Sequence, residues 1–259
     1  MAVVLLEQLG ATRVVTINRP EARNALTREV LAGLREAFDS ASSDAAIRCV
    51  VLTGAGGHFC SGADLRQTLL EDPQLFEHLE SYMDDFHGVI RSVVRCSKPV
   101  IAQMDGAAVG FGADLAFACD LRVASSRAYV QEKFVSIGLM PDGGGSFWLP
   151  RLVGTARAMR MILLAEKVGA EELADLGVVA RVAEAEALEA AAQEIAKKVE
   201  AGPPLAFAAI KRAVYASLGS VEDALRRERE EQLRLLRTAD LMEGVTAWME
   251  KRQPRFLGK

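Results

Sequence analysis

The sequence predicts an α/β fold that ends in a helical region. Two observations predict the α/β part: residues 47–65 and residues 98–124 each run from a continuous apolar segment through a Gly-rich turn into a helical pattern. A third observation, helical periodicity in the residues beyond Gly154, predicts the helical end. The 259 residues suffice for one large domain, or for a core with a smaller helical appendage.

Strands and helices are expected to alternate in the first part of the chain. Gly10 separates the two strands of an expected hairpin, Pro20 ends the second strand, and the apolar residues that follow recur at helical spacing. The apolar run 47–53 is typical of a parallel strand that is buried on both faces. The expected elements are strands 3–6, 13–18, 47–53, 99–103, 119–124 and 128–131, and helices 26–40, 66–96 and 147–154.

The residues after Gly154 are predicted to be helical. Breaks fall at Gly177, at residues 202–204 and at Gly219. The expected helices are 155–164, 170–176, 185–200, 205–217 and 221–252. We therefore divide the chain into a core over residues 1–200 and a C-terminal helical region over residues 201–259.

Residues 98–124 form the stretch around which the chain is organised. An apolar strand leads into a turn with Gly106, Gly110 and Gly112, and the turn opens a short apolar helix that carries Asp114. The first N–H groups of a helix lack internal acceptors and lie at the positive end of its dipole, so this turn is suited to an oxyanion. The alternative is structural, because such glycines also let a helix pack closely on a sheet, and an early acid is often only a partner of the dipole.

Two further Gly-rich segments favour the functional interpretation. Residues 54–65, GAGGHFCSGADL, follow a strand and precede a helix, an arrangement that receives anions, although the spacing fits neither a P-loop nor a dinucleotide fingerprint. Residues 137–154 place Asp142 directly before three glycines and close to Met140 and Trp148. Partial desolvation there would raise the pKa of Asp142. Taken alone, this aspartate fits the N-cap of the next helix equally well.

Composition argues against several classes of function. A formal net charge of −4 gives no overall attraction to nucleic acid or to an anionic membrane, and no segment has the pattern of a secretion signal or a membrane span. The chain is therefore expected in the cytoplasm, with neither nucleic acid nor membrane as a partner. Four scattered cysteines without CxxC spacing and three histidines without a ligand pattern predict buried, reduced thiols and no metal site.

Five motifs in order resemble the crotonase family, also called the enoyl-CoA hydratase/isomerase family. They are NRPEARNAL, GAGGHFCSGADL, KPVIAQMDGAAVGFGADLAFACDLRVAS, IGLMPDGGGSFWLPRLVG and the terminal KRQPRFLGK, and they span nearly the whole chain. The resemblance implies a crotonase-like spiral of ββα units, with residues 201–259 involved in trimerisation and active-site closure. It also implies a homotrimer or a dimer of trimers, no prosthetic group, and a coenzyme A thioester as the substrate.

The resemblance also implies which residues contact the substrate. The thioester oxygen is expected between the backbone N–H groups of Ala63 and Phe111, where one such donor is worth ~3 kcal/mol to an enolate. The residues that match positions around the adenine and pantetheine are Arg23, Ala25, Leu26, Ser61, Asp64, Leu65 and Arg66. The residues expected around the acyl group are Phe134, Met140 and Trp148.

The acids differ from those of a typical hydratase of the family. Two glutamates hold the water in such hydratases, and the matching positions here are Asp114 and Phe134. Asp142 instead matches an aspartate of the dienoyl-CoA isomerases and of the ring-epoxide isomerase of phenylacetate degradation, whose motif is the most similar. The resemblance therefore implies double-bond isomerisation, with Asp142 as the base that moves the proton and Asp114 as a second acid/base or an orienting group.

Other reactions remain open from the sequence. The first alternative is reversible hydration of an enoyl-CoA. Dehalogenation would need Asp142 as a nucleophile and a pocket for an aryl halide. A non-catalytic member that binds acyl-CoA or RNA is a further alternative, although the acidic balance argues against RNA.

Overall fold

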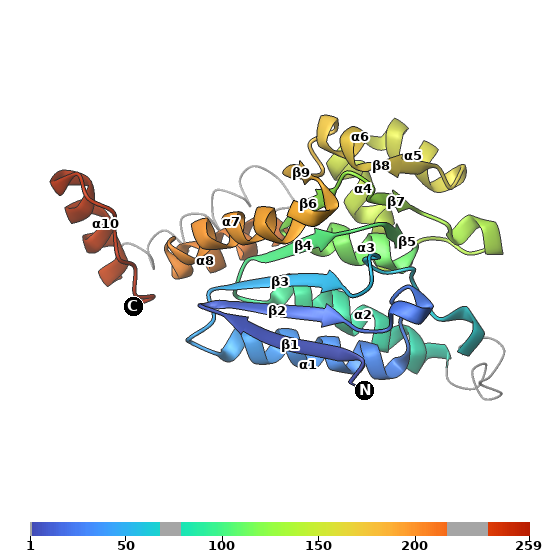
Figure 1. Cartoon of the computed structure of the whole chain (residues 1–259), viewed down its shortest axis with the longest axis horizontal. Helices are drawn as coiled ribbons and strands as arrows, with labels where there is room; N and C mark the ends of the chain where they lie inside the picture. The colour runs from blue at the N-terminus through green and yellow to red at the C-terminus, as the bar shows by residue number, and fades with distance from the viewer. Residues whose placement is uncertain (1, 68–78, 217–237) are drawn as a thin grey trace.

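The computed structural model describes residues 2–67, 79–216 and 238–259. Two β-sheets and the helices around them make a mixed α/β fold, as the sequence predicts (Figure 1). None of the helices described in these ranges is long and apolar enough to cross a membrane.

The larger sheet has six strands in the order β1-β2-β3-β4-β6-β9. Their bounds are β1 Val4–Leu9, β2 Thr12–Ile17, β3 Cys49–Gly54, β4 Val100–Met104, β6 Leu121–Ser125 and β9 Arg181–Ala183. β1 and β2 form the predicted antiparallel hairpin, and every other neighbouring pair is parallel.

The smaller sheet has three short strands in the order β5-β7-β8. Their bounds are β5 Ala107–Val109, β7 Tyr129–Gln131 and β8 Lys167–Gly169. The sequence predicted a turn where β5 lies, which was wrong, and it assigned no strand to the stretches between the predicted helices where β8 and β9 lie. Each of these strands has only three residues, which is too short for a period-two pattern, and each pairs with a segment that is remote in sequence.

The helices lie close to their predicted positions. Their bounds are α1 Arg28–Ser43, α2 Leu79–Arg95, α3 Phe111–Ala118, α4 Gly145–Val153, α5 Thr155–Leu163, α6 Ala170–Asp175, α7 Leu188–Glu200, α8 Pro204–Ala216 and α10 Ala239–Glu250. Short 3-10 helices cover η1 Pro20–Ala22, η4 Phe134–Ile137 and η5 Ala185–Ala187. The predicted helices 66–96 and 221–252 lie partly outside the described residues; α2 falls within the first and α10 within the second.

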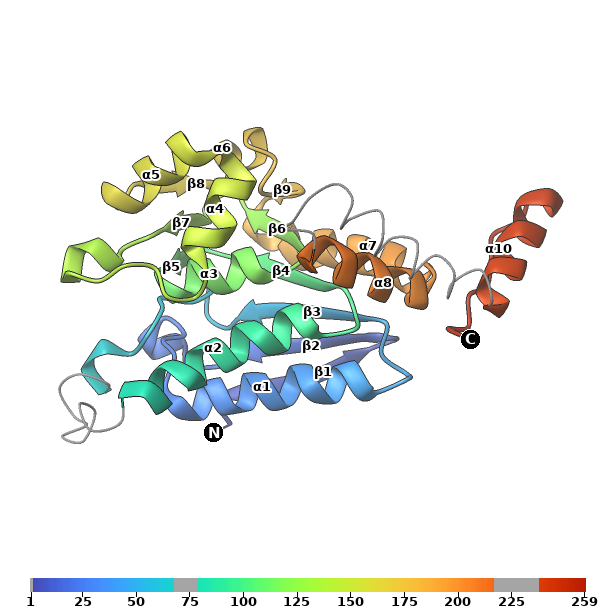
Figure 2. The same cartoon turned by 180° about the vertical axis from the view of Figure 1, so that it is seen from behind.

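The larger sheet is covered on both faces. α1 and α2 lie on one face and α7 lies on the other (Figures 1 and 2). Alternate residues of β3 serve the two sides: Val50 and Leu52 belong to the main core with α1 and α2, whereas Cys49 and Val51 pack with α7. This confirms the prediction of a strand that is buried on both faces.

All four cysteines are buried and free. Burial is the main cause that raises the pKa of Cys49 and Cys60, each to about 12. The thiols therefore stay protonated at neutral pH and pack as small apolar groups.

Candidate active site

The loop of residues 60–64 lies against the N-terminal end of α3. The Val109 N–H donates to Cys60 O at 2.9 Å. A β-carbon placed on Gly62 would lie 2.8 Å from Val109 O and 3.4 Å from Phe111 N. Gly62 also has φ of 90°, so the loop makes this close approach only because residue 62 is glycine. The structure thus brings the segment of Ala63 beside Phe111.

The N–H groups of Ala63 and Phe111 donate to no acceptor among the described residues. Leu26 bonds on either side of Ala63, because its N–H donates to Gly62 O at 2.8 Å and its C=O accepts from Asp64 N at 3.0 Å. In such a parallel bridge the middle residue turns its own N–H away from the partner strand. Phe111 is the first residue of α3, so its N–H has no acceptor within the helix. Both amides are therefore available to a ligand oxygen.

The rings of Phe111 and Phe134 take different places. Phe111 is 2% exposed and meets Phe86 of α2 edge-to-face, with ring centroids 4.7 Å apart. Phe134 is buried in η4, and its ring lies 3.8 Å from the place of a β-carbon on Gly110, the residue before Phe111. Phe134 therefore lies beside the amide of residue 111, whereas the Phe111 ring fills the core.

Asp114 is fully buried in the first turn of α3. Its Oδ2 accepts a hydrogen bond from the Gly143 N–H at 2.8 Å. Burial raises the pKa of Asp114; the Gly143 hydrogen bond opposes this effect, and the charge of Asp142 adds to it. The structure therefore joins Asp114 to the triple glycine that follows Asp142.

Asp142 is half-buried just before α4. Its Oδ1 is buried and has no hydrogen-bond partner among the described residues, and its backbone carbonyl lies 3.0 Å from His87 Nε2 on α2. Burial raises the pKa of Asp142, and the charge of His87 opposes that shift. Such a carboxyl group, partly desolvated and with an unpartnered oxygen, is suited to accept a proton from a ligand.

Glu132 is a third acid of the site, and the sequence did not predict it. It follows β7, is 1% exposed, and neither of its carboxyl oxygens has a hydrogen-bond partner among the described residues. Burial raises the pKa of Glu132, and the charges of Asp114 and Asp142 raise it further. A signal was present, because period-two alternation places Glu132 on the same inward face as Val130. The described residues contain no group of His, Cys, Asp and Glu arranged to hold a metal ion.

The glycines after Asp142 let the acids approach one another. A β-carbon on Gly143 would lie 2.6 Å from the β-carbon of Asp114. A β-carbon on Gly145 would clash with Asp114 Oδ1 and would lie 3.1 Å from Glu132 Oε1. Only glycine leaves room for both carboxyl groups at this turn.

Trp148 and Met140 differ in their surroundings. The Trp148 Nε1–H donates to Gly143 O at 3.3 Å, and its ring packs edge-to-face against Phe147 and Tyr215. Met140 is 67% exposed in the segment between η4 and Asp142. The structure thus joins Trp148 to the triple glycine, whereas Met140 is largely exposed.

The segments expected to hold CoA lie side by side. The Ser61 N–H donates to Arg23 O at 3.0 Å, and Leu26 bridges Ala63 as described above. Ala25 and Leu26 are buried, whereas the side chains of Arg23, Leu65 and Arg66 are exposed.

Asp64 makes an internal ion pair. Its Oδ2 lies 2.9 Å from Arg19 Nη1. Burial opposes ionisation of Asp64, but hydrogen bonds from Gln67 and Arg19 outweigh it and lower its pKa. This carboxylate therefore holds the loop that carries Ala63.

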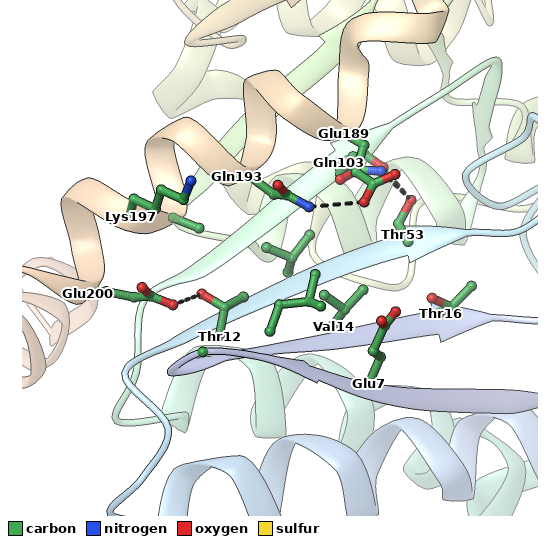
Figure 3. Close-up of a pocket in the computed structure, with 14 residues that line it drawn as sticks. Glu7, Thr12, Val14, Thr16, Thr53, Gln103, Glu189, Gln193, Lys197 and Glu200 are labelled. Carbon is green, nitrogen blue, oxygen red and sulfur yellow. Dashed lines mark hydrogen bonds between the residues drawn. The ribbon is translucent and has the colours of Figure 1, made fainter.

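A separate hollow of about 490 Å³ lies on the face of the larger sheet that carries α7 (Figure 3). Residues of β1 to β4 and of α7 line it, and the Thr12 hydroxyl donates to Glu200 there at 2.6 Å. None of its lining residues is among those that the sequence predicts for the site. The hollow is therefore distinct from the acids and the two free amides.

Residues 8–259 match the family model described as Enoyl-CoA hydratase/isomerase. A Rhodobacter capsulatus protein described as a probable enoyl-CoA hydratase is 41% identical over 247 residues, covering 95% of this chain and 94% of that protein. The 1,2-epoxyphenylacetyl-CoA isomerase of Escherichia coli is 36% identical over 247 residues, covering 95% and 94%. The crystal structure of an enoyl-CoA hydratase from a Polaromonas species superposes with a TM-score of 0.93 at 36% identity, covering 98% of this chain and 99% of that one. The predicted fold is thus confirmed.

Proposed function

Because the chain belongs to the enoyl-CoA hydratase/isomerase family, we propose that this enzyme moves a double bond along the acyl chain of a CoA thioester. Asp142 removes a proton from the carbon next to the thioester carbonyl of a 3-enoyl-CoA. The resulting dienolate takes the same proton back at the γ carbon, which gives the 2-enoyl-CoA. The N–H groups of Ala63 and Phe111 hold the carbonyl oxygen, on which the negative charge develops.

The observation that carries the proposal is the unequal engagement of the two aspartates. Oδ1 of each aspartate lacks a hydrogen-bond partner among the described residues. Asp114, however, is fully buried and its Oδ2 already accepts from Gly143, whereas Asp142 is only half-buried. One carboxylate is enough to move a proton between the α and γ carbons, since no water has to be activated. This supports Asp142 as the base and Asp114 as the orienting group.

The residue at position 134 supports isomerisation over hydration. Phe134 offers no oxygen at the place where typical hydratases have their second glutamate. Glu132, two residues earlier, is 1% exposed and is therefore poorly placed to hold a water against a substrate. An apolar wall near the oxyanion position instead favours an acyl chain.

The CoA part of the substrate is proposed to lie along residues 23–26 and 61–66. These segments are hydrogen-bonded to each other and leave Arg23, Leu65 and Arg66 exposed. Exposed arginines suit the phosphates of CoA. Phe134, Met140 and Trp148 are proposed to contact the acyl group. The reaction as proposed uses no prosthetic group.

Asp142→Asn tests the proposal. Asparagine keeps the shape of the side chain but cannot take a proton, so we expect migration of the double bond in 3-enoyl-CoA to slow by about 10²- to 10⁴-fold. The conversion to 2-enoyl-CoA is followed by chromatography of the CoA esters. Asp39→Asn, on the exposed face of α1, is the matched control and should retain the full rate.

Hydration of a 2-enoyl-CoA is the second candidate, since the relative with 41% identity is described as a hydratase. The same preparations are incubated with crotonyl-CoA, and the 3-hydroxy product is quantified. Strong hydration of crotonyl-CoA without double-bond migration would favour hydration over isomerisation as the function. Full turnover by Asp142→Asn would instead remove Asp142 from the mechanism.

A further inference from the structure

Glu132 and Asp114 meet at the turn of the three glycines. Glu132 Oε1 lies 3.1 Å from the place of a β-carbon on Gly145, and Asp114 Oδ1 lies closer still to the same point. Glu132 is 1% exposed and Asp114 is fully buried. Two carboxyl groups from β7–η4 and from α3 thus share one dry space.

One proton is needed to make this contact favourable. Two carboxylates are acceptors only, so each would leave the other unpartnered and repel it. Asp114 already accepts from the Gly143 N–H at 2.8 Å, which stabilises its charged form. Glu132 has no donor among the described residues, so the proton belongs on Glu132.

We propose that Glu132 is a positioning residue that, as a neutral acid, donates a hydrogen bond to Asp114 Oδ1. Asp114 then has a donor on each oxygen, Gly143 on one and Glu132 on the other. Neither oxygen of Asp114 is then left to orient a water, and the turn that follows Asp142 is held in place. Asp142 remains the base that moves the proton, and this catalytic role of Asp142 rests on the proposed function.

The charged surroundings of the pair are the same in every variant compared below. Titratable and charged groups on the elements packed around it include Asp142 before α4, His87 on α2, Lys133 after Glu132, Arg151 on α4, and Arg157 and Arg160 on α5. Asp142 acts on both carboxyl groups, and His87 acts on Asp142. Arg157 is paired with Glu166 at 2.9 Å, and Lys133 is exposed.

The protonation of Glu132 is tested without any substrate. Glu132 keeps its proton in the folded state and loses it in the unfolded state above the ordinary glutamate pKa of 4.5, so wild-type stability falls as pH rises. Glu132→Gln keeps the hydrogen bond but has no proton to lose. We expect its Tm to rise relative to wild type by several degrees between about pH 5 and about pH 9. If the Tm of Glu132→Gln and the Tm of wild type changed in parallel with pH, the proposal would be overturned.

The positioning role is tested by comparing Glu132→Gln with Glu132→Ala in the isomerisation assay. The Gln amide still donates to Asp114, so we expect a loss of only a few-fold, whereas Ala should lose about tenfold or more. Ala should also raise the ratio of hydration to isomerisation, because Asp114 Oδ1 becomes free. Equal losses in the two variants would overturn positioning, since the proton itself would then be required.

Gly145→Ala tests the meeting point itself. Its added methyl group would clash with Asp114 Oδ1 and crowd Glu132 Oε1. We expect a lower Tm and slower isomerisation than in Gly169→Ala, whose methyl group meets no atom within 4 Å. Equal behaviour of the two variants would show that the carboxyl groups do not meet at Gly145.

The two hypotheses fail in different ways. Suppose that neither wild type nor any variant isomerises an enoyl-CoA, while the Tm of Glu132→Gln still diverges from that of wild type with pH. The proposed function then fails, but the proposal that Glu132 is protonated stands. If wild type isomerises and the Tm curves stay parallel, the function stands and the role of Glu132 falls.

Discussion

At the scale of residues, surroundings give two identical side chains different roles. Asp114 is sealed by α3 and the three glycines and accepts from a backbone N–H, whereas Asp142 is half-buried and faces His87. Desolvation is the leading cause that raises the pKa of both. Only Asp142, however, combines that shift with partial exposure, which a proton-transfer group needs.

His87→Gln tests how α2 tunes Asp142. The charge of His87 lowers a pKa that burial raises, so its removal should raise the pKa of Asp142 further. A base works only when ionised, and its activity is lost as pH falls through its pKa. We therefore expect the acidic limb of the kcat/KM profile for isomerisation to move to higher pH. Gln can still donate to the Asp142 carbonyl, which His87 contacts at 3.0 Å.

The control for this substitution is Arg91→Gln, which removes a positive charge from the exposed side of the same helix. Screening by solvent should leave its acidic limb where wild type has it. The assignment of His87 as the group that lowers the pKa of Asp142 would be contradicted in either of two cases. The acidic limb of the kcat/KM profile could move to lower pH in His87→Gln, or it could move equally in both variants.

At the scale of elements, α3 connects the two halves of the site. Its first N–H is free, its first turn carries Asp114, and all eight of its residues are buried. A helix buried on every side needs no polar stripe, which is why its sequence is apolar all round. A rigid, buried helix places the amide and the acid with fixed geometry.

The carboxylate of Asp120 binds two side chains of helix α8. Lys211 Nζ lies 2.7 Å from Asp120 Oδ2, and the same oxygen accepts from Val100 N at 2.7 Å. The Tyr215 hydroxyl donates to Asp120 Oδ1 at 2.8 Å. Lys211 is 7% exposed, so this ion pair is largely shielded from water.

Lys211→Met should destabilise the protein, because it leaves the carboxylate of Asp120 buried without its cation. We expect the free energy of unfolding to fall by about 3 kcal/mol, measured by urea denaturation. Lys198→Met, which removes a lysine with 74% exposure on α7, should change it by less than about 0.5 kcal/mol. Asp120→Asn combined with Lys211→Met should recover part of the loss, and strict additivity would argue against the coupling.

At the scale of the whole molecule, α8 packs beside α2, whereas α10 stands apart from the two sheets in both views (Figures 1 and 2). Large apolar side chains on α8 and beyond it remain exposed, among them Ile210 at 56%, Met242 at 64% and Leu257 at 67%. Exposed apolar surface of this kind marks protein interfaces, which supports the proposal that the C-terminal helical region serves trimerisation.

Size-exclusion chromatography with light scattering measures the mass of the assembly and so tests its oligomeric state. We expect a mass of three or six times the 27.9 kDa of the chain. Ile210→Glu places a charge in the proposed interface and should shift the mass toward one chain, whereas Lys198→Glu on α7 should not. A monomeric wild type, or an unchanged mass in Ile210→Glu, would argue against this interface.

Local patterns in the sequence were enough for much of the fold and for singling out two of the three acids at the site. Neighbouring residues alone predict the apolar run of β3, the hairpin at Gly10, and the order of strand, glycine turn and helix around Asp114. Asp142 was found in the same way, from the glycines beside it. Such features need no knowledge of distant segments, because spacing and backbone freedom are local properties.

Tertiary structure alone decided which groups meet. Glu132 joins Asp114 only because the turn at Gly145 brings β7 and α3 together, and Asp64 pairs with Arg19 across two loops. The strands β5, β8 and β9 likewise exist through partners far away in the chain. Burial and pairing are properties of the folded molecule, so the charge state of an acid depends on contacts that no local pattern contains.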